Sequence, residues 1–179
     1  MKSLEWKSPR VHLGLLFAAL ALVQSAAAAE NCEKQLQKGS ADFQAGNRTA
    51  AETDFRNAAF DGCSTELVAL AKASKDKVAF THDVLKGGAY SGDLELQKNY
   101  AFFLLAKQDE ASKGGPPLQE PNEEIYAFAS IIAARGETWA ANYVSTLDKL
   151  MPPSANYVEK LHTEKVRAKI AEYQAERAK

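Results

Sequence analysis

The sequence of 179 residues predicts an all-α protein, a short α-solenoid of stacked antiparallel helix hairpins. Three observations support this fold class. Apolar residues recur every three or four positions along most of the chain, which is the period of a helix. Pairs and triplets of Gly, Asn, Asp and Pro interrupt this pattern at short intervals. The alternation of apolar and polar residues that marks a half-buried strand is absent.

The first 29 residues show the three parts of a cleaved secretory signal peptide. Lys2, Lys7 and Arg10 give the segment a basic start, an apolar run covers residues 13–23, and residues 26–29 are alanines. The apolar run is much shorter than the roughly 20 residues that a membrane-spanning helix needs, so an uncleaved anchor is the weaker alternative. The alanine-rich exit is typical of bacterial signals, and we expect a periplasmic or secreted protein.

The charge balance narrows the range of partners. The signal segment holds three basic residues and one acidic residue, so the 22 basic and 23 acidic residues of the chain become 19 and 22, a net charge of −3. No basic stripe remains that would hold a phosphate backbone, which excludes nucleic acid as a partner. No second apolar run is long enough for stable membrane insertion after cleavage.

The mature chain begins with a predicted helix hairpin. One helix starts at Cys32 and ends at Gly46-Asn47, and the next spans residues 48–60 and ends at Asp61-Gly62. Two helices joined by so short a turn pack antiparallel, which brings Cys32 and Cys63 to the same end of the pair. Because cysteines pair in an oxidising compartment, we expect a Cys32–Cys63 disulfide, with two free buried thiols as the alternative.

The middle of the chain is also predicted to be helical. One or two helices start at Ser64 and extend to about Lys86, where Gly87-Gly88 is expected to stop them. Asp93 is a predicted N-cap for the next helix, which extends to about Ser112. That helix is among the most apolar segments and should lie centrally in the core.

A Gly- and Pro-rich stretch at 113–117 predicts a loop before the last three helices. The first of these is capped by Asn122, the second spans residues 138–151, and the third is capped by Ser154. The final turns, residues 171–179, are charged and rich in alanine. They are expected to fray or to project from the domain.

The spacing of Gly39, Gly46, Ala51, Phe55 and Ala58 in the first hairpin resembles that of the tetratricopeptide repeat. In that repeat small residues lie where the two helices touch, and an aromatic side chain fills the space beside them. The resemblance therefore implies close contact between the two helices of this hairpin.

The second half of the chain resembles the Sel1-like variant of these repeats. Residues 124–136 are similar to the second helix of a Sel1-like unit, residues 137–142 to the start of the next unit, and residues 150–154 to the break before a last helix. The resemblance implies a tetratricopeptide/Sel1-like helical repeat domain over residues 30–165, followed by a charged C-terminal helix end at 166–179.

The resemblance also implies a class of function. Stacked hairpins leave an extended surface that binds other proteins. The expected function is a non-enzymatic periplasmic protein-interaction module, acting as an adaptor, an assembly factor or a signalling regulator on another envelope or secreted protein. The alternative is an immunity protein that masks a toxin delivered to the periplasm, and an enzyme with scattered catalytic residues is a weaker third hypothesis.

Few residues carry chemistry of their own. His82 and His162 lie far apart, and neither has Cys, Asp or Glu at the spacing of a metal motif. Phosphate-binding loops and nucleophile elbows are absent from the sequence. We therefore expect no catalytic residue, no metal and no cofactor. Tyr126 and Tyr143 are the candidate partner-binding residues, because tyrosine suits a half-hydrated contact surface; packing in the core is the alternative for both.

Overall fold

The structure is a computed structural model that describes residues 29–114 and 122–179. The predicted signal peptide and most of the predicted Gly/Pro loop lie outside these residues. The described residues form helices joined by short turns and contain no strand, so the predicted all-α class is confirmed.

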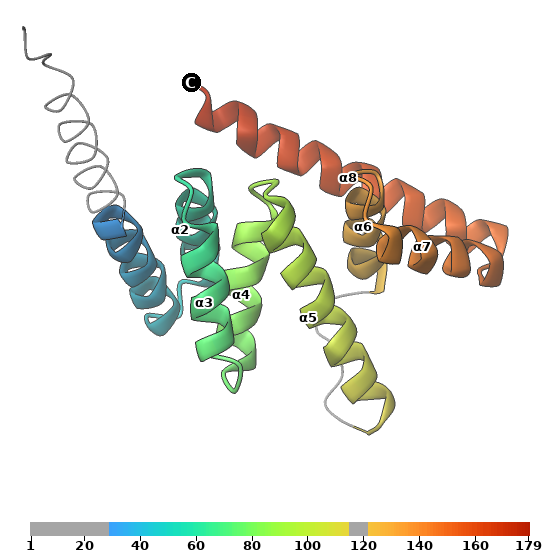
Figure 1. Cartoon of the computed structure of the whole chain (residues 1–179), viewed down its shortest axis with the longest axis horizontal. Helices are drawn as coiled ribbons and strands as arrows, with labels where there is room; N and C mark the ends of the chain where they lie inside the picture. The colour runs from blue at the N-terminus through green and yellow to red at the C-terminus, as the bar shows by residue number, and fades with distance from the viewer. Residues whose placement is uncertain (1–28, 115–121) are drawn as a thin grey trace, which may run out of the picture.

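Apart from the segment between α5 and α6, which lies mostly outside the described residues, the helices follow one another with short connections (Figure 1). The first spans residues 29–44 and is called helix 29–44 below. It is followed by α2 (Arg48–Phe60), α3 (Ser64–Ala73), α4 (Val78–Ala89), α5 (Leu94–Ser112), α6 (Asn122–Ala133), α7 (Thr138–Leu150) and α8 (Pro153–Arg177).

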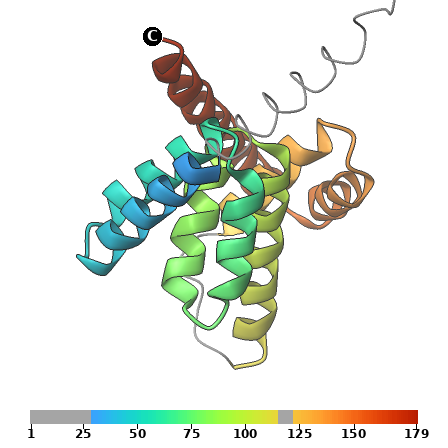
Figure 2. The same ribbon diagram turned by 60° about the vertical axis from the view of Figure 1, so that its left-hand side comes forward.

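The helices pack as a chain of neighbours around one core. α4 packs against α2, α3 and α5, α5 packs against α6, and α6 packs against both α7 and α8. Figure 2 shows α3, α4 and α5 side by side. A single cluster of buried apolar residues extends from Cys32 at one end to Ile170 on α8. These contacts are compatible with the predicted stack of hairpins.

The first hairpin packs as the sequence predicts. Gly39 lies against the ring of Phe55, where a Cβ atom would be only 2.6 Å from Phe55 Cε1. Phe55, Ala51 and Ala58 are fully buried. Cys32 and Cys63 form the predicted disulfide, with their Cα atoms 5.5 Å apart at the open end of the hairpin.

The prediction that Gly87-Gly88 stops a helix is wrong. α4 continues through both glycines to Ala89 and turns only at Gly92, whose φ is +89°. A Cβ on Gly87 would lie 2.5 Å from the backbone oxygen of Glu52, and one on Gly88 would lie 2.9 Å from Leu96. The pair therefore lets α4 approach α2 and α5 closely, and this packing outweighs the weak helix propensity of glycine.

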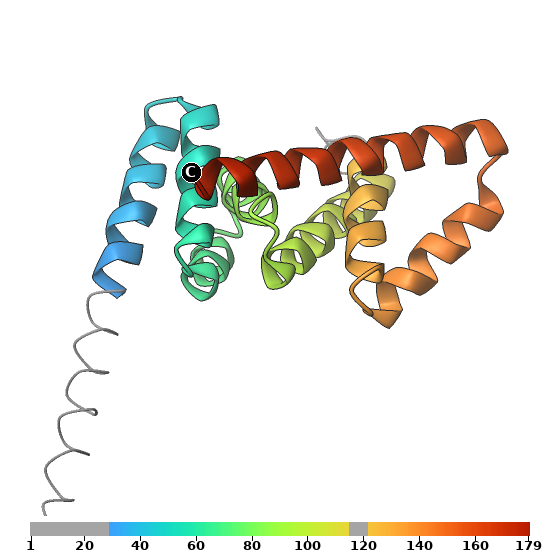
Figure 3. The same cartoon turned by 90° about the horizontal axis from the view of Figure 1, so that it is seen from above.

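The expectation that residues 171–179 fray or project is also wrong. α8 has 25 residues, about 37 Å at the standard rise, and it runs back across the molecule to α2 (Figure 3). Gln174 Nε2 donates to the backbone oxygen of Ser91 at 3.0 Å, and Arg177 pairs with Asp61. The last turns of α8 therefore fasten the two halves of the chain together.

Side-chain caps were predicted at Asp93, Asn122 and Ser154, and the structure shows the outcome for Asp93 and Ser154. Asp93 accepts the N–H of Leu96 at 2.9 Å and so caps α5 as predicted. Ser154 does not cap α8, which begins one residue earlier at Pro153. Proline is well suited to the first helical position because the N–H it lacks would have no partner there.

Candidate functional site

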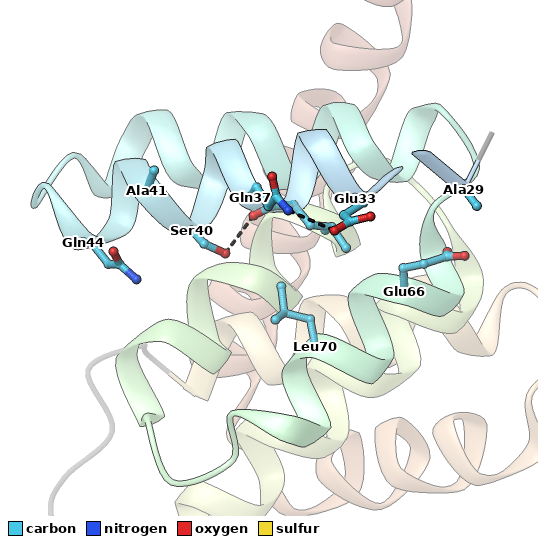
Figure 4. Close-up of a pocket in the computed structure, with 9 residues that line it drawn as sticks. Ala29, Glu33, Gln37, Ser40, Ala41, Gln44, Glu66 and Leu70 are labelled. Carbon is cyan, nitrogen blue, oxygen red and sulfur yellow. Dashed lines mark hydrogen bonds between the residues drawn. The ribbon is translucent and has the colours of Figure 1, made fainter. Parts of the chain in front are cut away.

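The candidate site is a groove of about 630 Å³ between helix 29–44 and α3 (Figure 4). It is called the α3 groove below. Its lining residues are Ala29, Glu33, Leu36, Gln37, Ser40, Ala41, Gln44, Glu66 and Leu70.

Helical spacing explains why these side chains share the groove. The seven residues from helix 29–44 follow the i, i+3, i+4, i+7 pattern of an α-helix, which places them on one face of that helix. Glu66 and Leu70 are four residues apart on α3 and therefore also share a face. The adjoining face of helix 29–44 packs on α2, where Gly39 meets Phe55.

The α3 groove has two different ends and an apolar middle. Glu33 and Glu66 lie with Ala29 at one end, and Gln44 lies at the other (Figure 4). Leu70 projects from α3 toward helix 29–44 between these ends, and it is half-buried. A surface of this kind can bury apolar side chains and form hydrogen bonds or ion pairs at its rim.

The disulfide fixes the acidic end of the groove. Cys32 immediately precedes Glu33, and Cys63 is the N-cap residue of α3, three positions before Glu66. The bond therefore holds the starts of the two groove-forming helices together. The backbone segments that carry the two glutamates therefore stay at the same end of the groove.

A second cluster of polar residues lies inside the fold. The guanidinium of Arg48 pairs with both carboxylate oxygens of Asp83, with Nε donating to Oδ2 at 2.6 Å. His82 Nδ1 lies 2.9 Å from Asp83 Oδ1, and the Tyr100 hydroxyl lies 3.2 Å from His82 Nε2. Asp83 and Tyr100 are fully buried and the His82 side chain is 11 % exposed, so this chain of side chains links α2, α4 and α5 inside the fold.

Burial and neighbouring charges shift the pKa values of two carboxyl groups in this cluster. Burial acts to raise the pKa of Asp83, but hydrogen bonds from His82 and Arg48 outweigh it and hold that pKa below its usual value. Burial raises the pKa of Glu52, which the Lys86 ammonium partly opposes.

The same cluster contains a set of possible metal ligands that the sequence did not indicate. One ligand atom each from Glu52, His82 and Asp83 lies within 4.8 Å of the others. However, the Arg48 guanidinium already occupies both oxygens of Asp83, and a cation there would be repelled by it. The arrangement is that of a buried salt-bridge network, and a metal ion does not fit it.

The two tyrosines predicted to bind a partner lie outside the groove. Tyr126 is only 2 % exposed, and its hydroxyl donates to Asp148 Oδ1 at 2.7 Å. Burial and the Asp148 carboxylate raise the pKa of Tyr126 to about 12. Tyr143 is half-buried, and burial raises its pKa too. His162 Nδ1 lies 3.8 Å from Glu123 Oε2, and His162 is not part of the buried cluster that contains His82. Tyr126 thus offers little contact surface in this conformation, and partner binding by either tyrosine stays a prediction.

Apolar side chains are also exposed away from the groove. Four of them, on α7 and the first turns of α8, are Leu150, Tyr157, Val158 and Leu161. Phe102 is exposed on α5, where its ring stacks on Trp139 with centroids 4.5 Å apart. Exposed apolar groups of this size are common at surfaces that contact other proteins.

None of the helices in residues 29–114 and 122–179 is both long and apolar enough to cross a bilayer.

Comparison of the chain with known proteins gave no match. Neither the protein-family models nor the curated proteins nor the solved structures contain a significant match to it. The contact between Gly39 and Phe55 agrees with the tetratricopeptide resemblance, but membership of that family stays a prediction.

Proposed function

We propose that this protein is a non-enzymatic protein-interaction module of the cell envelope. It binds another envelope or secreted protein in the α3 groove and acts as an adaptor, an assembly factor or a signalling regulator. The observation that carries the proposal is the groove itself, which has an apolar centre, polar ends and two helical walls joined by a disulfide.

The geometry of the groove suits a peptide segment of a partner. Once the predicted signal peptide is removed, the helical wall from Glu33 to Gln44 is about 16 Å long at the standard rise per residue. This length accommodates about three turns of a partner helix or about five residues of an extended strand. Because the walls are preformed helices, this protein loses little conformational entropy when a partner binds.

The buried polar cluster supports a binding role over an enzymatic one. An acid–histidine–tyrosine chain resembles catalytic machinery, but a catalytic group must reach its substrate. Asp83 and Tyr100 are fully buried, and Asp83 is neutralised by Arg48. The cluster is therefore better explained as a device that positions α2, α4 and α5.

The envelope location rests on the disulfide and on the predicted signal peptide. Disulfides persist in the periplasm and outside the cell and are rare in the cytosol. Cys32 and Cys63 are both buried, and they account for all the cysteines of the chain.

A matched pair of tryptophan variants tests the proposal. Ala41 lies in the α3 groove and Ala141 lies on α7, and both are exposed helical residues. Ala41→Trp fills the groove, whereas Ala141→Trp adds the same bulk elsewhere. We expect wild type and Ala141→Trp to capture the same partner from an envelope extract and Ala41→Trp to lose it. Equal capture by both variants contradicts the groove as the binding site, and capture of a secreted toxin assigns the immunity function.

A further inference from the structure

The acidic end of the α3 groove carries two carboxylates that the protein itself does not neutralise. Among residues 29–114 and 122–179, neither Glu33 nor Glu66 forms an ion pair; the one polar contact of Glu33 is the Gln37 amide, which donates to it at 3.0 Å. Both side chains are exposed and lie at the same end of the groove (Figure 4).

The nearby lysines serve other carboxylates. Lys34 pairs with Glu30 at 2.7 Å, and Lys38 pairs with Asp54 at 2.5 Å. The basic residues of helix 29–44 are thus engaged outside the groove, and its acidic end keeps its negative charge.

The disulfide holds the backbones of these two glutamates at the same end of the groove. Glu33 follows Cys32 directly, and Glu66 lies one helical turn after Cys63, so the covalent bond keeps the two residues on facing walls. Glu66 also occupies the first turn of α3, where a negative charge interacts favourably with the helix dipole.

We propose that the α3 groove recognises a partner segment that is basic at one end and apolar in the middle. A Lys or Arg of the segment meets Glu33 and Glu66, and the adjacent apolar side chains pack against Leu36 and Leu70. Opposite charges at an interface fix the direction of the bound segment and reject acidic competitors. This inference rests on the proposed function and assigns the chemistry of its partner.

The segment is first mapped by cross-linking. A diazirine-bearing residue at Gln37, in the middle of the groove, is activated in envelope extract, and the attached segment is sequenced. The same probe at Asn142, an exposed residue on α7, is the control. We expect adducts at Gln37 alone, on a segment with Lys or Arg next to apolar residues. Absence of any adduct at Gln37 overturns the proposed function and this inference together. An adduct to a second copy of this chain, or to a segment without Lys or Arg, overturns the inference only.

The mapped segment, made as a peptide, then tests the charges. Its affinity is measured for the oxidised protein, for Glu33→Gln/Glu66→Gln and for Glu164→Gln/Glu172→Gln, a control pair on α8 with the same change in net charge. Loss of two exposed ion pairs corresponds to about a fivefold weaker affinity for the peptide. We expect this loss only in the groove variant, and the difference from wild type should become smaller as the salt concentration rises. A change below twofold in the groove variant, or an equal change in both variants, overturns the inference. Exchanging the charges should restore binding: Glu33→Lys/Glu66→Lys is paired with a peptide in which Glu replaces the basic residue. Failure to restore binding also counts against the inference.

Discussion

Loss of the Cys32–Cys63 disulfide should lower the free energy of unfolding by about 3.7 kcal/mol at 25 °C. The two cysteines are 31 positions apart, and the chain-entropy model gives this value for a loop of that length. The effect acts on the unfolded chain, which regains the freedom that the bond removes. Helix 29–44 is the first element of the described chain and packs from one side only on the rest of the fold. Its other tethers are the packing of Gly39 on Phe55 and of Phe43 on Phe80 and the polar contacts Lys38–Asp54 and Gln35–Asp61, so it should be the first element to open.

Urea unfolding followed by circular dichroism measures this loss. Oxidised wild type is compared with reduced wild type, which keeps both sulfur atoms in the core, and with Cys32→Ala/Cys63→Ala. Both unbridged forms should show the decrease, and hydrogen exchange should show faster opening in helix 29–44 than in α4 or α5. A decrease below about 1 kcal/mol, or equal opening of all helices, would refute the reasoning that the bond constrains this hairpin.

Further predictions concern the packing and the buried charges. Gly87→Ala should destabilise the protein by about 1–3 kcal/mol and more than Gly88→Ala in the same urea assay, because the new methyl meets a backbone oxygen rather than a flexible leucine. Asp83→Asn should cost about 2–3 kcal/mol, less than a fully buried ion pair, because the Arg48 side chain is 44 % exposed and can be rehydrated. Folding lowers the pKa of Asp83, so its charged form stabilises the protein above the unfolded-state pKa near 3.8, and this stability is lost as pH falls through the lower folded-state pKa. The difference in unfolding free energy between wild type and Asp83→Asn should therefore shrink below about pH 4. Tyr173→Leu should lower stability by about 0.5–1 kcal/mol, because the Arg56 guanidinium lies 3.5 Å from that ring, and a neutral outcome would mean that α8 docks without this contact.

Features encoded by neighbouring residues could be read from the sequence. α2 spans residues 48–60 as predicted, because turn-forming pairs stand at both of its ends. Asp93 caps α5, and the cysteines pair because a short turn forces antiparallel packing. These inferences use interactions within one helix or between consecutive helices.

Features that depend on distant contacts could not be read in the same way. Gly87-Gly88 looks like a helix stop until the backbone of α2 is known to lie against it. Arg177 looks like part of a free charged end until α8 is seen to reach Asp61. His82 seemed isolated because Tyr100, which lies against its Nε2, and Arg48, which pairs with the adjacent Asp83, come from other helices.

The α3 groove was missed although part of its signal is local. Polar and small residues recur at helical spacing from Glu33 to Gln44, which marks a face that does not pack in the core. The sequence did not show that Leu70 and Glu66 of α3 face the same space. Because tyrosine suits a half-hydrated contact surface, the sequence favoured Tyr126, which is buried in the structure with its hydroxyl on Asp148.

Hydrogen–deuterium exchange with the captured partner tests the central claim most directly. If the partner binds the α3 groove, the amides of helix 29–44 and α3 should exchange more slowly in the complex, while those of α7 should not change. Slower exchange confined to α6, α7 and α8, with helix 29–44 and α3 unaffected, would contradict the account.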